Sequence, residues 1–136
     1  MKRLINLSFI PVNTDAALLI LRVWLGLGVF VKHGIEKITG FSNMAKHFPD
    51  PIGIGSTASL SFALFSDAVC PVLVIIGLAT RLASSFIIIN LFVAFAFLFK
   101  FSIDKPHSEL AFVYLGAFIT LLIAGGGKYS IDSKLK

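Results

Sequence analysis

Cysteine and charge are both scarce in this chain. Cys70 is the single cysteine among 136 residues, which excludes an intrachain disulfide, a CxxC redox pair and an iron–sulfur cluster held by one chain. Charged residues make up only 14% of the chain, whereas soluble domains carry about 25%. Too little polar surface is left to cover a water-soluble core. The composition therefore predicts a membrane protein.

Acidic residues are fewer than basic ones, with seven Asp and Glu against twelve Lys and Arg. In an apolar chain such a basic excess ordinarily lies beside the membrane, where it orients helices or meets anionic lipid. We therefore expect a lipid bilayer, and no nucleic acid, among the partners. The basic start and the apolar piece up to Val12 resemble a signal peptide, but no small-residue cleavage site follows. We expect a retained segment at the membrane interface.

Hydrophobic residues account for 57% of the chain and gather in four runs. Because about 20 helical residues cross a hydrocarbon core of about 30 Å, we expect membrane spans at about 16–33, 58–79, 82–99 and 109–127. No alternation of apolar and polar residues indicates strands. Two connections are tight, and a long loop at about 34–57 is left between the first and second helices. We predict an all-α fold, a transmembrane four-helix antiparallel bundle, in a single domain over residues 1–136.

Polar residues inside these runs are the first candidates for a functional site. Arg22, Asp67 and Asn90 lie at similar expected depths on three helices. A charge at the bilayer centre costs ~2.5 to 3.5 kcal/mol, so we expect Arg22 to face inward and pair with Asp67. Pro71 cannot donate the helical hydrogen bond to the Asp67 carbonyl, which leaves that oxygen free. The alternative is a satisfied internal network that only fixes helix register.

A second polar set is expected towards the opposite membrane face. His33 continues the helical stripe of Arg22, Gly26 and Val29. Glu109 begins the fourth helix, and small residues later in that helix predict a contact seam that would turn Glu109 inward, towards His33. The pair could relay a proton, or Glu109 could simply stabilise a helix N-terminus. The three histidines, at positions 33, 47 and 107, share no ligand spacing, so no metal site is expected.

Several short motifs, in this order, resemble those of the DoxX family of small four-helix membrane proteins. They are Arg22-Val-Trp-Leu-Gly26, then Lys32-His33-Gly34-Ile-Glu-Lys37-Ile-Thr-Gly40-Phe41, the hairpin Ile76-Gly77-Leu78-Ala-Thr80-Arg81, Glu109, and the closing Gly125-Gly-Gly-Lys-Tyr-Ser130-Ile-Asp132. The resemblance adds Lys37 to the candidate residues. In the second helix the family usually has a glutamate followed by glycines, whereas this chain has Asp67-Ala-Val-Cys-Pro71.

The resemblance implies an accessory role in membrane redox chemistry, because relatives are associated with quinone-linked electron transfer and with redox-stress complexes. It suggests quinone as a cofactor and a redox protein as a partner. The chain shows no electron carrier of its own, and whether it is an enzyme stays open. A non-catalytic scaffold or lipid-binding subunit is the alternative. A small transporter or proton pathway is a third, which would need a homo-oligomer.

The expected location is the cell's inner (plasma) membrane, as a multi-pass protein. Six basic residues lie on the side that would hold both termini, and five lie on the other side. This small excess favours cytoplasmic termini under the positive-inside rule.

Overall fold

The computed structural model describes residues 1–136, and all of its regular structure is helical. The elements in chain order are α1 (Lys2–Ile5), α2 (Thr14–Val29), α3 (Ile35–Met44), α4 (Ser56–Leu64), α5 (Cys70–Ile76), α6 (Thr80–Val93), α7 (Ser108–Ala124) and α8 (Ile131–Lys134). Three π-helical turns lie within these helices. One joins α2 to α3 (Phe30–Gly34), one joins α4 to α5 (Phe65–Val69), and one extends α6 (Ala94–Leu98). Three helices are long and apolar enough to cross a membrane, and α7 is a shorter apolar helix of 17 residues.

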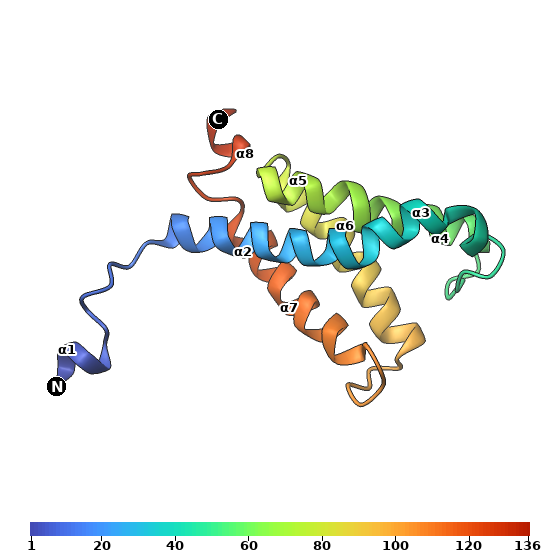
Figure 1. Ribbon diagram of the computed structural model, residues 1–136, viewed down its shortest axis with the longest axis horizontal. Coiled ribbons are helices and arrows are strands. Elements are labelled where there is room, and N and C mark those ends of the chain that lie inside the picture. Colours follow the sequence, from blue (N-terminus) through green and yellow to red (C-terminus); the bar gives the residue numbers. More distant parts are fainter.

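The first long helix runs from Thr14 to Met44 without a break. Asn13 caps its start by accepting the backbone N–H of Ala16 at 3.0 Å. At ~1.5 Å per residue its 31 residues extend about 46 Å. Figure 1 shows this helix as one rod (α2 and α3) beside α4 and α5, with the N-terminal segment projecting away from the bundle.

The expected end of this helix at His33 is wrong. The chain stays helical through the π-helical turn Phe30–Gly34 and on to Met44, so the connection to α4 covers only residues 45–55. Gly34 is needed inside the helix because a Cβ there would collide with the backbone of Asp67 and Ala68. In the sequence Gly34 suggests the end of a helix, but in the structure it is the point of close contact between two helices.

The second helix runs from Ser56 to Ile76 and accommodates Pro71. Proline cannot donate the usual backbone hydrogen bond, and the helix widens into the π-helical turn Phe65–Val69 just before it. This turn packs against the π-helical turn of the first helix. Two irregular turns thus face each other, and Gly34 and Asp67 lie in them.

The two remaining helices complete the bundle. Gly77 ends α5 in the left-handed conformation, with a φ of 75°, and α6 begins at Thr80. α6 and α7 pack extensively along each other. The bundle core is a cluster of eight buried residues from α2, α5, α6 and α7: Leu25, Val29, Cys70, Val74, Ala83, Ile87, Phe118 and Leu121. Many large apolar side chains remain exposed around it, which suits a lipid environment.

Arg22 holds one end of the bundle together. Its guanidinium donates to the carbonyls of Val74 and Ile75 at the end of α5, at 3.2 and 2.7 Å. It also donates to the carbonyls of Gly126 and Tyr129, at 3.1 and 2.8 Å, in the segment after α7. Only 1% of Arg22 is exposed. One side chain therefore ties the first helix, the second helix and the C-terminal segment to one another.

Asp132 completes this end of the fold. Its carboxylate accepts the first N–H groups of α6, from Ala79 at 2.7 Å and Thr80 at 2.8 Å. Burial opposes its ionisation, but the hydrogen bond from the Thr80 backbone leads the contacts that lower the pKa of this carboxyl. The helix N-terminus also favours a negative charge there. The C-terminal segment is thus held by Arg22 and by Asp132 together, and Figure 1 shows α8 beside the end of α5.

Replacing Arg22 should destabilise the whole bundle. Arg22→Leu would remove a donor from four buried or partly buried carbonyls. The Val74 carbonyl would keep the N–H of Gly77, whereas those of Ile75, Gly126 and Tyr129 would lose the donor that Arg22 supplies, and each such loss costs about 1–3 kcal/mol. We expect a loss of at least about 3 kcal/mol, read as a lower unfolding midpoint in detergent. Arg81→Leu is the matched control, because Arg81 is exposed and donates only to the Leu122 carbonyl. Equal midpoints for the two variants would contradict the role given to Arg22.

Candidate pocket around Lys37 and Asp67

A cavity of about 450 Å³ lies between the π-helical turns, α6, α7 and the loop 45–55. This size falls within the range of small-molecule sites, about 300–1,000 Å³. Of its 23 lining residues, 15 are hydrophobic, so its walls are mainly apolar. The cavity reaches the molecular surface, because Ile52, Ile89 and Leu98 line it and are also exposed.

An ion pair lies at the polar end of this cavity. Lys37 Nζ is 2.8 Å from Asp67 Oδ2, and both side chains are 9% exposed. Asp67 is the sole protein acceptor of the Lys37 ammonium, so two of its three N–H donors remain for another molecule. An apolar wall with a few convergent polar groups is the usual composition of a ligand pocket.

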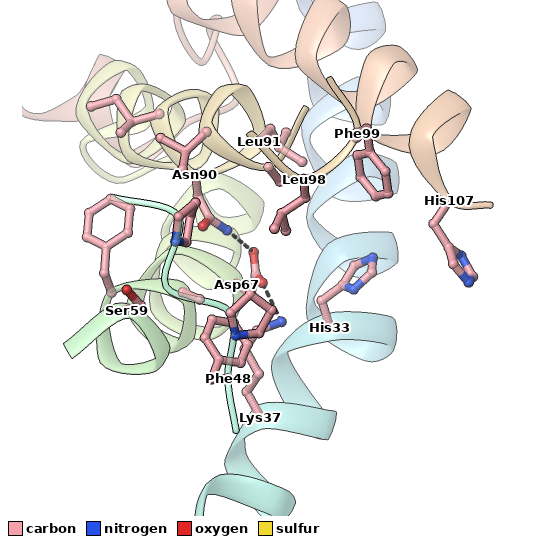
Figure 2. Close-up of a pocket in the computed structure, with 18 of the residues that line it drawn as sticks. His33, Lys37, Phe48, Ser59, Asp67, Asn90, Leu91, Leu98, Phe99 and His107 are labelled. Carbon is pink, nitrogen blue, oxygen red and sulfur yellow. Dashed lines mark hydrogen bonds and ion pairs between the residues drawn. The ribbon is translucent and has the colours of Figure 1, made fainter. Parts of the chain in front are cut away.

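The other oxygen of Asp67 is held by neighbouring side chains. Asn90 Nδ2 donates to Asp67 Oδ1 at 3.2 Å, and the Ser66 hydroxyl donates to the same oxygen at 3.2 Å. Figure 2 shows Asp67 between Asn90 on α6 and Lys37 on α3, with its contacts to both drawn as dashed lines. The carboxylate is therefore fixed in position before any ligand arrives.

The local backbone explains why Lys37 and Asp67 meet. Side chains on a helix tilt towards its N-terminus, so Lys37 reaches back by about a turn, to the level of Asp67. Gly34 allows the two helices to approach closely at this level. The facing π-helical turns shift the side chains that follow them, and such turns often occur at functional sites.

His33 and Tyr114 are further polar side chains in the cavity lining. The His33 ring is half-buried and forms no hydrogen bond within the protein. Tyr114 of α7 also lines the cavity, and Gly28 makes room for its hydroxyl, which a Cβ at that position would strike. In Figure 2 the His33 ring projects from the first helix towards the cavity, and His107 lies farther out. His33 and Tyr114 thus add donors and acceptors to the lining of the cavity.

The loop 45–55 covers one side of the cavity with apolar side chains: Phe48, Pro49, Pro51, Ile52 and Ile54. Asp50 fixes this loop to the start of α4. Its carboxylate accepts from the backbone of Gly55 and Ile54, at 2.8 and 2.9 Å, and from the Ser59 hydroxyl at 2.9 Å. The hydrogen bond from Gly55 is the main reason that the pKa of Asp50 is lowered. The anchor is therefore complete at neutral pH and is lost only in acid.

The expected ion pair between Arg22 and Asp67 does not form. Asp67 lies ten residues before Gly77, about 15 Å along the helix from the hairpin end where Arg22 is bound. The expected depth of Arg22 is counted from the start of the first helix. That helix begins about two turns before the level of the α5–α6 hairpin, so Arg22 lies at the hairpin and not deep in the bundle. Arg22 is therefore not at the cavity, and Lys37 supplies the cation for Asp67.

The expected inward position of Glu109 is also wrong. Glu109 is exposed and is not among the residues that line the cavity. The buried face of α7 consists of Ser108, Ala111, Phe118 and Leu121. The small residues that suggested a seam, at positions 116, 120 and 124, are exposed, and a Cβ at Gly116 would meet only open space. The His33–Glu109 relay is therefore not supported.

The lining residues Ser59 and Tyr114 and the apolar residues of loop 45–55 were not found from the sequence. Lys37 was a candidate only through the family resemblance, although its helical spacing also marks it. It follows His33 by four residues and so extends the stripe of Gly26, Val29 and His33 by one turn, provided that the helix continues. No comparable periodicity marks the loop.

This fold and cavity describe a helical membrane protein with a mainly apolar pocket and one buried ion pair. The profile of the DoxX family matches residues 17–100, which is more than half of the chain. The protein therefore belongs to the DoxX family, a family of small membrane proteins. It is also 27% identical over 135 residues to an uncharacterized protein of Haemophilus influenzae, covering 92% of this chain and 87% of the relative. No solved structure matches it.

The ion pair should show strong energetic coupling. Lys37→Met or Asp67→Asn alone leaves an unpaired buried charge, which costs about 3–5 kcal/mol. The double variant removes both charges, and we expect it to recover most of the loss. The unfolding midpoints of the wild type, the two single variants and the double variant in one detergent would measure this coupling. Lys32→Met, an exposed lysine of the same helix, is the control, and additive losses would show that the pair does not interact.

Proposed function

We propose that this protein is a four-span membrane accessory of redox chemistry and that it binds a lipophilic molecule, such as a quinone, in the pocket around Lys37 and Asp67. One observation supports this most directly: a buried ion pair with unused donors at the end of an apolar cavity of about 450 Å³. A pair that served only to fix helix register would not need such a cavity beside it.

The residues present fit a quinone in chemical terms. Lys37 has N–H donors for a carbonyl oxygen, and the apolar walls suit a ring and part of its chain. When bound, a quinone would supply the electron and proton exchange that no side chain here supplies. The chain's own residues would orient a polar head group through Lys37 and His33 and exclude water with the loop 45–55.

We further propose that four helices cross the inner membrane in antiparallel order with both termini in the cytoplasm. Lys37 lies in the pocket and no longer counts as a loop charge, which leaves four basic residues on the far side against six on the side of the termini. A redox partner protein would deliver or remove electrons, and a homo-oligomer would bring two pockets together.

Mass spectrometry of an organic extract tests this proposal. Protein purified in mild detergent should carry a near-stoichiometric lipophile, quinone in the first instance. The Lys37→Met/Asp67→Asn double variant, expected to fold, should lose it, and Lys32→Met should retain it. Equal amounts of the lipophile in the double variant would contradict the proposal. Membrane phospholipid as the sole molecule lost would instead favour the lipid-binding subunit.

A further inference from the structure

The charged side chains that line the pocket indicate which ligand head groups it can accept. Lys37 contributes one positive charge and Asp67 one negative charge, and they are 2.8 Å apart, so the polar end of the cavity is neutral as a whole. Two histidines also line the cavity, the half-buried His33 and the exposed His107, and no other Asp, Glu, Lys or Arg lines it. A ligand with a net charge would therefore find no unpaired carboxylate, ammonium or guanidinium group in the cavity.

The pair nevertheless offers both kinds of hydrogen bond to a neutral group. Lys37 has two remaining N–H donors. On the acceptor side, Asp67 Oδ1 already accepts from Asn90 and Ser66, and Oδ2 faces Lys37 with lone pairs to spare. A carbonyl or hydroxyl head group can meet these atoms without breaking the ion pair.

We propose that the Lys37–Asp67 pair makes the pocket selective for lipophiles with an uncharged, oxygen-bearing head group and rejects anionic and cationic amphiphiles of the same chain. The proposal rests on the lipophile-binding function above and adds its specificity. A charged head would be desolvated in the cavity or would have to compete for Lys37 or Asp67, leaving the other charge unpaired. The same pair predicts how the selectivity changes when one partner is removed.

Asp67→Asn leaves Lys37 as an unpaired cation and should create affinity for an anionic head group. Lys37→Met leaves Asp67 as an unpaired anion and should create affinity for a cationic head group. The double variant has no net charge in the pocket and should accept neither. This reciprocal gain of binding is the signature of charge selection, because a merely loosened fold would not gain opposite preferences in two variants.

The experiment uses three photoreactive alkyl probes of equal chain length, which carry an alcohol, a sulfonate or a trimethylammonium head. The full chain is placed in nanodiscs of zwitterionic lipid, and labelling of pocket-lining peptides is measured at equal membrane concentration of each probe. In the wild-type protein the alcohol should label the pocket at least about tenfold more than either charged probe. Asp67→Asn should raise sulfonate labelling, and Lys37→Met should raise trimethylammonium labelling, each by about tenfold.

The outcomes separate the two proposals. Equal labelling of the wild-type pocket by the alcohol and the sulfonate would overturn the selectivity while leaving lipophile binding intact. Absence of pocket labelling by every probe in every protein would overturn lipophile binding itself. If either single variant does not fold, the wild-type comparison alone decides, because it needs no substitution. Lys32→Met should keep the wild-type pattern, and any change in it would show that surface charge controls the labelling.

Discussion

The structure depends on the hydrogen bonds and the ion pair that its few buried charged side chains form. Arg22 uses its guanidinium on four backbone carbonyls at the hairpin end, and this engages the first helix, the second helix and the C-terminal segment. Because Arg22 is occupied there, Asp67 needs another cation, and Lys37 supplies it at 2.8 Å. The two basic residues thus have separate roles. Arg22 holds the hairpin end of the bundle together, and Lys37 pairs with Asp67 in its interior, where the pocket lies.

The pairing of Lys37 with Asp67 requires that the first helix continues past Gly34. A first helix that ended at His33 would leave Lys37 in a loop, and Asp67 would be an unpaired buried charge, which is costly in a low-dielectric interior. Gly34 and the two facing π-helical turns bring the helices close enough for the pair to form. Local backbone irregularity, close packing and the polar end of the pocket are thus consequences of one contact between two helices.

Much of the helical content could be predicted from the sequence, because apolar runs of membrane length are a strong signal. The expected spans at 58–79 and 82–99 lie within about three residues of Ser56–Ile76 and Thr80–Leu98. The partners of the charged residues could not be predicted. The sequence gives the depth of a residue only by counting from the start of its own helix, and in the fold the helices do not start at the same level. For α7, hydropathy alone does not say which face is buried, and the small residues indicated the wrong one.

An experimental structure of the protein, purified from its native membrane into nanodiscs without added ligand, tests the central claim most directly. The account predicts Lys37 paired with Asp67, Arg22 bound to the carbonyls of the hairpin end, and elongated non-protein density in the pocket with its polar end at Lys37. A pocket filled by the protein's own side chains, or Asp67 paired with Arg22 instead of Lys37, would contradict it.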